Sequence, residues 1–300
     1  MGHLMREISR PNLSRLTTLR LGGNAVAEFV LEENKDFAAL FSKVSSLGLP
    51  MLVIGKGSNL LAMDGELPLV LVRPAFNDKP EIIGQAGEKV FVKVGSGCNL
   101  SSLLGFCLRN GLSGLEGLCG IPASVGGAIA MNAGSFGTDT FQNLEQITVA
   151  TKNGFFDFKK SQLKPSYRRL EIPQIGSGWI VTNSIFGLTR RPKDGIFRAM
   201  HLNFFEKKSK QPITAYTAGC VFKNPSSQIP AGKLLDMAGF RGKRHGGVLF
   251  SDRHANFLVN EGNGSAEAAL ALIREAQNVV WHKFGYQLDL EVKVVPCHLP

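Results

Sequence analysis

GLEGLCGIPASVGGAIAMNAGSFG, residues 114–137, is so rich in small residues that side-chain packing cannot be its main purpose. Glycine is accepted where the backbone must take φ > 0 or press its N–H groups against another group. Gly126, Gly127, Gly134 and Gly137 can together offer several amides to phosphate oxygens, and Glu116 is the only charged residue of the segment. The segment predicts either a nucleotide-phosphate site or a small-residue turn between packed elements.

Two further glycine turns follow apolar runs. GKGSNLL, residues 55–61, comes directly after the apolar residues 51–54, and Gly95-Ser96-Gly97 ends another strand candidate. The first is not a dinucleotide fingerprint, because the third glycine of G-x-G-x-x-G would fall at Leu60, and no Walker sequence occurs in the chain. Each turn alone is commonly an ordinary tight turn. Three together indicate one extended ligand that contains phosphate.

Length and composition indicate a folded chain of about two domains. The sequence has 300 residues, of which 44% are hydrophobic and 19% charged. No run reaches the roughly 18 uninterrupted apolar residues of a membrane span, and the start, MGHLMREISRPNLSRL, lacks the apolar core of a signal peptide. We therefore expect a cytoplasmic protein.

The charge and the cysteines narrow the class further. A net charge of +10 fits an anionic partner, which can be nucleic acid, a phosphorylated metabolite or a membrane surface. Basic clusters at residues 190–191, 207–210 and 241–244 are not interleaved with aromatic residues, so solvated surface is the simpler interpretation of each. Five cysteines without a CxxC pair indicate reduced thiols, and no pattern indicates a metal site.

The pattern along the chain predicts strands in the middle and helices toward the end. Strands are expected at residues 26–31, 51–54, 69–72, 90–94, 147–151, 179–186 and 288–295. Helices are expected at 37–47, at 232–238 and between Ser265 and Gly285, together with an amphipathic helix marked by Phe197, Met200, His201, Phe204 and Phe205. The polar residues 207–212 are expected to connect two domains.

AGCVFKNP, residues 218–225, places a thiol near a lysine. A nearby cation lowers the pKa of a thiol from about 8.5 toward neutrality, which makes Cys220 a candidate general acid. A lone cysteine is otherwise a small buried hydrophobic residue.

Arg168 and Glu291 form a candidate ion pair. Arg168 interrupts a strand-rich region and can bind a carboxylate or phosphate, while Glu291 lies inside the apolar run LDLEVKVV. If both faces of that strand are covered, the Glu291 carboxylate needs a partner, and Arg168 can supply it. Simple alternation, with Glu291 and Lys293 facing solvent, is the other interpretation.

Several motifs in one order give the chain a family resemblance. TTLRLGG (residues 17–23), GKGSNLL, the segment 114–137, SYRR (166–169), AGCVFKNP, PAGKLLDMAG (230–239), HANFLVN (254–260) and the terminal LEV (290–292) run through the whole sequence. With these motifs the chain resembles the UDP-N-acetylenolpyruvoylglucosamine reductases, flavoenzymes of bacterial peptidoglycan precursor synthesis, in the form without an extra insertion.

The resemblance implies an α+β fold. An FAD-binding domain of the vanillyl-alcohol-oxidase type would span residues 1–205 in two subdomains, about 1–70 and 71–205, and a substrate-binding domain would span 206–300, with its last strand returning toward the flavin site. The motifs assign FAD binding to Arg20, Gly55, Gly57, Ser58, Asn59, Gly117, Gly120, Ile121, Pro122, Ser124, Gly126, Gly127, Ala128, Asn132 and Gly134.

The resemblance also implies the reaction. NADPH would reduce the flavin, and UDP-N-acetylglucosamine enolpyruvate would then take hydride at C3 and a proton at C2 to give UDP-N-acetylmuramate. Arg168 would stabilise charge on the substrate carboxylate, Glu291 would be its partner or a second polarising group, and Cys220 would be the proton donor. Tyr167, Tyr216, Lys223, Asn224 and Asn256 would contact the substrate. We expect a monomer that contributes to cell-wall biogenesis, cell shape and division.

Two departures and two alternatives remain. The family commonly has serine in place of Cys220, and its Y-R-x-S pattern ends here in Leu170. A thiol is the stronger acid, so the first change keeps the proposed role, whereas the second bears on how Arg168 is held. The alternatives are an FAD-linked oxidase or dehydrogenase for another substrate, and a basic nucleotide- or nucleic-acid-binding module without chemistry, whose binding would weaken steeply with salt.

Overall fold

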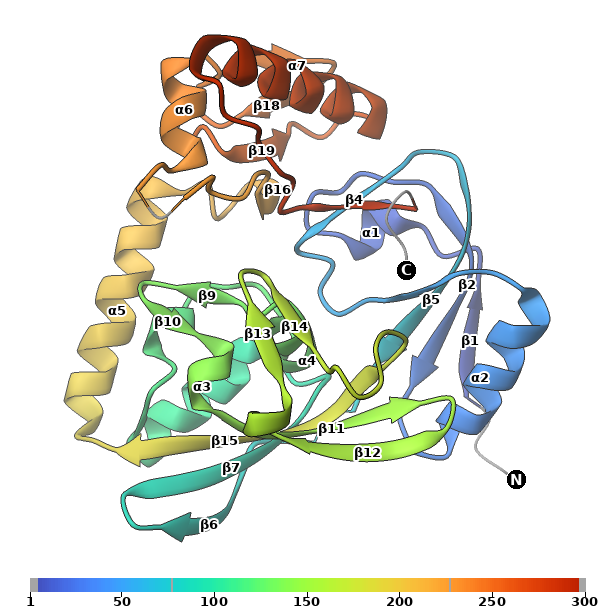
Figure 1. Ribbon diagram of the computed structural model, residues 1–300, viewed down its shortest axis with the longest axis vertical. Helices are drawn as coiled ribbons and strands as arrows, with labels where there is room; N and C mark the ends of the chain where they lie inside the picture. Colours follow the sequence, from blue (N-terminus) through green and yellow to red (C-terminus); the bar gives the residue numbers. More distant parts are fainter. Residues whose placement is uncertain (1–4, 77, 227, 297–300) are drawn as a thin grey trace.

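A computed structural model describes residues 5–76, 78–226 and 228–296, which form three main sheets and a long helix at the edge of the molecule (Figure 1). In that view the C-terminal sheet and its helices lie at the top, and α5 (Lys193–Lys210) runs along one side from the lower part of the molecule to this upper unit. The expected mixture of helices and strands is thus an α+β fold.

The first sheet has the order β1-β2-β5-β3, with bounds Arg6–Ser9, Asn24–Leu31, Glu66–Pro74 and Met51–Val53. Strands β2 and β3 both pair with β5 in parallel, so the connection between them crosses over through α2 (Asp36–Leu47). This helix ends at Gly48, which takes φ 62° as a left-handed cap. The strands and the helix expected from this part of the sequence are confirmed. A short helix, α1 (Leu13–Leu16), precedes β2.

The second sheet is antiparallel and has six strands. Its order is β12-β11-β15-β7-β6, with β8 beside β15, and the bounds are Gly154–Lys159, Leu144–Thr151, Ile180–Arg190, Lys89–Gly95, Glu81–Ala86 and Leu112–Ser113. Helices α3 (Leu100–Asn110) and α4 (Val125–Ala130) pack on this sheet and share its largest apolar core. The expected strands at 90–94, 147–151 and 179–186 lie here.

Several short elements lie around α4 and between the strands of the second sheet. They are the 3-10 helices η1 (Glu116–Leu118), η2 (Thr140–Asn143) and η3 (Lys160–Gln162), and the two hairpins β9–β10 (Gly134–Ser135 and Thr138–Asp139) and β13–β14 (Lys164–Ser166 and Arg169–Glu171). The glycine-rich residues 114–137 therefore form η1, α4 and β9, the first strand of the β9–β10 hairpin.

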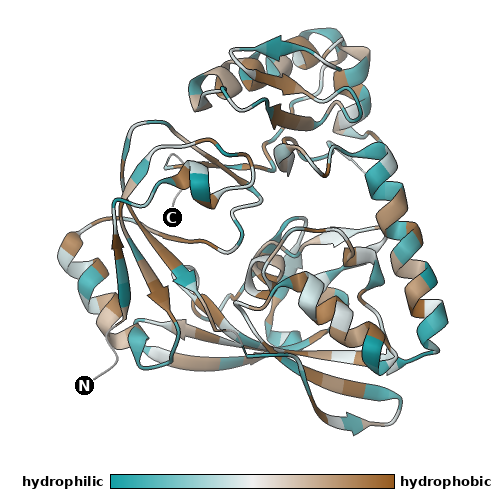
Figure 2. Ribbon diagram, turned by 180° about the vertical axis from the view of Figure 1, so that it is seen from behind, coloured by the Kyte–Doolittle hydropathy of each residue, from teal (hydrophilic) through white to brown (hydrophobic). Residues whose placement is uncertain are grey.

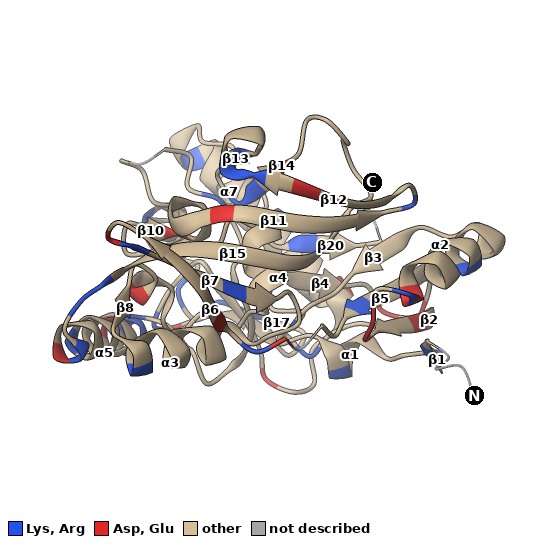
Figure 3. Ribbon diagram, turned by 90° about the horizontal axis from the view of Figure 1, so that it is seen from below, with Lys and Arg blue, Asp and Glu red and all other residues tan. Residues whose placement is uncertain are grey.

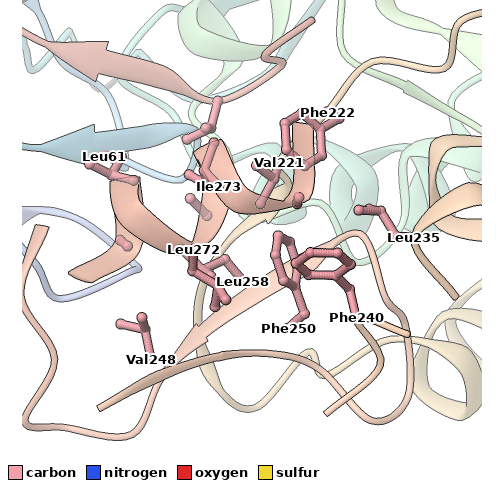
Figure 4. Packing of buried hydrophobic residues seen from close by; sticks show 14 of the residues in the cluster. Leu61, Val221, Phe222, Leu235, Phe240, Val248, Phe250, Leu258, Leu272 and Ile273 are labelled. Carbon is pink, nitrogen blue, oxygen red and sulfur yellow. The ribbon is translucent and has the colours of Figure 1, made fainter. Parts of the chain in front are cut away.

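The third sheet has the order β16-β19-β18-β17, with bounds Tyr216–Cys220, Phe257–Asn260, Val248–Phe250 and Arg244–His245. Helices α6 (Ala231–Met237) and α7 (Ala266–Phe284) cover it, and Ser265 and Gly285 cap α7 as the sequence predicts. Figure 4 shows Leu61, from the N-terminal part of the chain, packed near Ile273 of α7. The C-terminal unit therefore shares its core with N-terminal residues.

The expected strand at residues 288–295 is wrong for its first half. Only β20 (Lys293–Val295) is a strand, and it pairs in parallel with β4 (Leu60–Ala62), directly after the turn at 55–59. Upstream, the amides of Glu291 and Val292 both donate to the Val221 carbonyl, at 2.8 and 3.3 Å. These bonds bind the segment to the loop after β16 instead of extending a sheet.

Helix α5 differs from the amphipathic helix that the sequence predicts. Phe197 and Phe205 are 56% and 64% exposed, whereas Ile196 and Lys207 are buried. Figure 2 shows hydrophobic and hydrophilic residues mixed along the visible length of this helix. The helix also continues to Lys210, so residues 207–210 are not an irregular connection, and the expected domain boundary at 205/206 falls inside α5.

Charged residues are spread over many elements, as Figure 3 shows, and the basic ones form no single stripe in that view. Cys98, Cys107, Cys119 and Cys220 are free thiols, and Cys297 lies outside the described residues. Within the described ranges, no helix combines the length and the apolar character that crossing a membrane requires.

Candidate active site

The turn at residues 55–59 follows β3 and presents its backbone. Gly57 has φ 62°, and a Cβ added there would lie 2.4 Å from the Leu16 carbonyl oxygen. A Cβ on Gly55 would lie 2.4 Å from Ser124 Oγ. At Gly57 the close atoms belong to the backbone and φ is positive, so only glycine fits there, whereas at Gly55 the Ser124 side chain would have to move. The backbone amides of residues 55–59 donate to no other described residue, so this turn holds a row of free donors.

The start of α4 lies against the turn at residues 95–97. A Cβ on Gly126 would approach Ser96 Cβ to 2.8 Å. The expectation that Gly126 and Gly127 offer free amides is wrong, because Gly126 N donates to the Ser96 carbonyl (2.9 Å) and Gly127 N donates to Ser124 Oγ (3.2 Å). Their small size serves close packing of two backbone segments here.

Two buried polar atoms near these turns have no partner. Ser96 Oγ and Asn183 Oδ1 are both inaccessible and form no hydrogen bond with any described residue. Asn183 is paired with Gly95 across β15 and β7, so the two atoms belong to the same region. An unpaired buried polar group costs about 1–3 kcal/mol unless a ligand or water satisfies it. A water molecule or a polar group of a ligand is therefore needed beside the turn 95–97.

Neither Ser96 nor Asn183 was among the residues assigned from the sequence. The sequence does contain a pattern that indicates Ser96, because this residue stands between the two glycines of the turn 95–97. Asn183 had none, since a polar residue on a strand is common and only the fold shows that β15 places it beside that turn.

Most of the other predicted cofactor residues lie in or near η1, α4 and β9. The side chains of Asn132 and Arg20 contact other parts of the protein. Gly117, Gly120, Ile121 and Pro122 lie in and after η1, Ser124 and Ala128 at α4, and Gly134 in β9. The carbonyl oxygen of the Asn132 side chain accepts from Phe141 N at 3.1 Å. Arg20 is exposed and its guanidinium lies over the ring of Tyr216, 5.8 Å from the centroid, so it faces the C-terminal unit.

Arg168 and Glu291 form the ion pair that the sequence predicts. Arg168 Nε donates to Glu291 Oε1 at 2.5 Å, and the two side chains are 24% and 11% exposed. Arg168 Nη1 also donates to the Gly134 carbonyl at 3.1 Å, which links the pair to the β9–β10 hairpin. Burial lowers the pKa of Arg168, but Glu291 more than compensates and the net shift is upward. The guanidinium therefore stays charged.

The turn that carries Arg168 is held in an uncommon conformation. Arg168 has φ 60°, a region that residues with a side chain rarely adopt. Tyr167 lies beside it: its ring is 5.0 Å from the Arg168 guanidinium carbon, and its hydroxyl donates to Glu291 Oε2 at 3.5 Å. Burial and the Glu291 charge raise the pKa of Tyr167. Leu170, where the family pattern has serine, is buried in the sheet core.

Asn59 joins the free-amide turn to the ion pair. Its side-chain amide donates to the Glu291 carbonyl at 3.0 Å, and Lys293 N donates to the Asn59 carbonyl at 3.0 Å. Residues far apart in the sequence are thus fixed beside one another. A ligand on the turn amides and a second group at Arg168 would be neighbours.

Cys220 ends β16 next to this pair, but its expected acidity is wrong. Burial, followed by the negative charge of Glu291, raises the pKa of the Cys220 thiol to about 12, although Arg168 and a hydrogen bond with the Asn256 side chain lower it. Lys223 has no part in this balance. The tertiary neighbour that dominates is a carboxylate, which the local sequence does not show. The thiol is therefore protonated at neutral pH.

The side chain of Asn256 serves the protein backbone instead of pointing to a free surface. It is 2% exposed, donates to the Phe222 carbonyl at 2.8 Å and accepts from Phe222 N at 3.0 Å. The direct substrate contact expected of Asn256 is wrong in this arrangement, and its contribution is to hold the loop after Cys220. Asn224 Oδ1 accepts from Ala231 N at 3.0 Å, and Lys223 N donates to the Asp289 carbonyl at 2.8 Å.

The assembled site combines two kinds of chemistry. Free backbone amides at 55–59 suit anionic oxygens, while Arg168 offers a cation for a carboxylate and Cys220 a protonated donor close to it.

Two family models match the chain. The C-terminal domain of UDP-N-acetylenolpyruvoylglucosamine reductase matches residues 211–295, and an FAD binding domain matches residues 27–156. The first begins directly after α5, and the second covers most of the first two sheets.

Similar proteins cover nearly the whole chain. The UDP-N-acetylenolpyruvoylglucosamine reductase of Oleidesulfovibrio alaskensis is 44% identical over 96% of this chain and 98% of its own length. That of Nitratidesulfovibrio vulgaris is 43% identical over 97% and 99%. The crystal structure of the UDP-N-acetylenolpyruvylglucosamine reductase from Thermus caldophilus superposes with a TM-score of 0.81 at 34% identity, covering 98% of this chain and 100% of that one.

Proposed function

Because the chain belongs to the family of UDP-N-acetylenolpyruvoylglucosamine reductases, with an FAD-binding domain in its N-terminal half, we propose that it reduces UDP-N-acetylglucosamine enolpyruvate to UDP-N-acetylmuramate with NADPH as the electron donor. The observation that carries this proposal is the position of the Arg168–Glu291 pair, which Asn59 ties directly to the turn of free amides.

The described residues fit FAD. The amides at 55–59 suit its diphosphate, and the orphaned Ser96 hydroxyl and Asn183 carbonyl oxygen suit its hydroxyl and ring groups. Gly117, Gly120 and Gly126 pack closely against other parts of the protein, which holds the backbone around this turn in place. Bound there, FAD would supply hydride-transfer chemistry between NADPH and the substrate.

Arg168 acts where charge develops. Hydride addition to C3 of an enol ether beside a carboxylate builds negative charge on the carboxylate oxygens. The Arg168 guanidinium is held by Glu291 and by the Gly134 carbonyl, so it is oriented before the substrate arrives. A preoriented cation stabilises the transition state without reorganisation of solvent. Glu291 sets its direction and keeps it charged.

Cys220 supplies the proton for C2. Its raised pKa of about 12 keeps the thiol protonated at neutral pH, which is the state that a general acid requires. With this raised pKa, the Cys220 thiol is a weaker acid than an unperturbed thiol. Charge that develops on the substrate near Arg168 is what drives this proton transfer.

The remaining assignments concern the nucleotide end of the substrate. Tyr216, Lys223 and Asn224 lie on β16 and on the loop after it, on the side of the C-terminal unit; we assign Tyr216 and Lys223 to the diphosphate of the substrate and Asn224 to a substrate contact. Arg20 lies over Tyr216, and its expected contact with FAD stays a prediction. The division into a flavin domain and a substrate domain near residue 205, the monomeric state, the cytoplasmic location and the role in cell shape and division stay predictions.

An anaerobic visible spectrum tests the proposal. The purified protein should show flavin bands, which NADPH bleaches and UDP-N-acetylglucosamine enolpyruvate restores. Mass spectrometry should then find UDP-N-acetylmuramate, two hydrogens heavier than the substrate. Bleaching without return would instead support the alternative of another acceptor on the same fold, and no flavin bands even with added FAD would refute the assignment.

A further inference from the structure

Lys207 is a buried cation that the mechanism above does not use. Its side chain points from α5 into the molecule, and the residue is 4% exposed. Its Nζ donates to the Cys119 carbonyl at 2.5 Å and lies 5.4 Å from the centroid of the Phe136 ring. Among the described ion pairs none involves Lys207, so its charge rests on a carbonyl dipole and an aromatic face. A buried ammonium without a carboxylate is expensive and needs a reason.

The contacts of Lys207 converge on one loop. Asn203, one helical turn earlier on α5, donates through its side-chain amide to the Glu116 carbonyl at 3.1 Å. A Cβ on Gly120 would lie 3.3 Å from Lys207 Cδ. Two side chains of α5 therefore hold both ends of η1. This is the loop to which the family resemblance assigns flavin contacts.

The same ammonium also reaches the hairpin that anchors Arg168. Phe136 forms the tip between β9 and β10, and the Gly134 carbonyl in β9 accepts from Arg168 Nη1. A Cβ on Gly117 of η1 would lie 2.7 Å from the Ser135 carbonyl oxygen, so η1 and the hairpin are in close contact. Lys207, η1, the hairpin and Arg168 thus form one connected set.

We infer that Lys207 is a positioning residue: its charged ammonium ties α5 to η1 and to the β9–β10 tip, and so fixes both the flavin loop and the anchor of Arg168. The inference rests on the proposed function in one respect, that FAD binds at η1. The residue acts through these contacts and is not placed on the substrate or the cofactor.

The charge of this tie changes within an accessible pH range. Burial lowers the pKa of Lys207 to about 8, Cys119 opposes this shift and Arg168 adds to it. These are the titratable groups that face it, Cys119 from the segment after η1 and Arg168 from the turn between β13 and β14. On its own helix, Glu206 is paired with Lys210 and is exposed. Above this pKa the ammonium loses its charge, and the contacts with the carbonyl and the ring weaken.

The test is the dissociation constant of FAD, measured by flavin fluorescence from pH 6.5 to 9.5. The unsubstituted protein should bind FAD with constant affinity up to about pH 8 and more weakly above it. Lys207→Met should bind at least about tenfold more weakly at pH 7, because it lacks the charged hydrogen bond to the Cys119 carbonyl, and should show no alkaline loss. Lys207→Arg, which keeps the charge, should bind tightly over the whole range.

Lys208→Met is the matched control. Lys208 is the next residue of α5 and its side chain is exposed, so the substitution removes the same charge without the tie. It should reproduce the affinity and the alkaline loss of the unsubstituted protein. In the second half-reaction, Lys207→Met should reoxidise more slowly with the substrate than Lys208→Met, because the anchor of Arg168 is loosened.

Three outcomes would overturn the inference. The first is unchanged FAD affinity in Lys207→Met at pH 7, and the second is a loss of FAD affinity at alkaline pH that persists in Lys207→Met. The third is the same alkaline loss of FAD affinity in Lys207→Arg. This third outcome also decides the case if the methionine variant does not fold. If the unsubstituted protein binds FAD and turns over while these results occur, only this inference fails. If it binds no FAD, the proposed function and the inference fail together.

Discussion

The turn at residues 55–59 lies beside the cluster formed by Arg168, Glu291 and Cys220, since Asn59 Nδ2 lies 3.0 Å from the Glu291 carbonyl oxygen. The turn offers backbone groups, whereas the cluster offers side-chain groups. The turn offers backbone amides, and at Gly57 a side chain would meet the backbone of Leu16. The cluster consists of a guanidinium, a carboxylate and a thiol. Adding a methyl group should therefore damage the first site, and removing a functional group should damage the second.

Gly57→Ala should have the largest effect. A Cβ there would lie 2.4 Å from the Leu16 carbonyl oxygen, and its φ of 62° costs a residue with a side chain about 1–2 kcal/mol in addition. We expect a protein that purifies without flavin and has no activity. The absorbance of bound FAD after gel filtration measures this.

Gly87→Ala separates the two causes. Gly87 also has a positive φ, 57°, but a Cβ there would meet nothing within 4 Å. This variant should lose about 1 kcal/mol of stability and keep its flavin. If Gly57→Ala also keeps its flavin, the close approach at the turn is not what the site depends on.

Cys220→Ala should leave the flavin in place and slow one step. Reduction by NADPH should proceed as before, whereas reoxidation by the enolpyruvyl substrate should fall by about 10²–10⁴, the usual contribution of a general acid. Cys220→Ser keeps a proton donor and should retain much of the rate. Stopped-flow absorbance separates the two half-reactions. Reoxidation at the normal rate in the alanine variant would remove Cys220 from the mechanism.

Arg168→Met should slow the same half-reaction by about 10²–10³, the loss typical for one preoriented group at developing charge. Arg169→Met is its control, because Arg169 is the next residue, 72% exposed, and pairs with Glu171 outside the cluster. The control should react like the unsubstituted protein. Equal losses in both variants would mean that the β13–β14 turn, and not the Arg168 guanidinium, is what the reaction needs.

His254 gives the smallest expected effect, on stability alone. Burial, with a contribution from Arg241, lowers the pKa of His254 below 6.5 in the folded protein. The unfolded chain therefore binds more protons below pH 6.5, so the free energy of unfolding should fall as the pH drops through that value. Urea unfolding at pH 7.5 and 5.5 measures this loss. A His254→Gln variant should lose less stability between the two values, and an equal loss would assign the effect elsewhere.

Local sequence patterns predict the helices and strands well, but they predict the surroundings of individual side chains poorly. Helix caps at Gly48, Ser265 and Gly285 were readable because a cap depends on its own few residues. The sequence predicts that Lys207 lies on the solvated surface, yet the side chain of Lys207 is buried and packs against Gly120. No local pattern carries that information, because the partner lies 87 residues away in the sequence.

The same difference holds at the candidate site. The ion pair between Arg168 and Glu291 that the sequence predicts is present, whereas the role of the glycine turns stays a prediction. The predicted acidity of Cys220 is wrong, because Lys223 is only close in sequence, whereas burial and then the charge of Glu291 raise the pKa of the thiol. Asn256 was assigned to the substrate, whereas both ends of its amide bind Phe222. Predictions failed where a tertiary neighbour decides the chemistry.

The most direct measurement of the contrast between the two sites is an anaerobic stopped-flow experiment on Glu291→Gln. This change removes the carboxylate charge beside Arg168 and leaves the Glu291 carbonyl, which Asn59 binds, in place. We predict reduction by NADPH at the unsubstituted rate, followed by reoxidation with UDP-N-acetylglucosamine enolpyruvate that is slower by at least about tenfold. Equal slowing of both half-reactions would contradict the account, because it would mean that the backbone site and the side-chain site do not act separately.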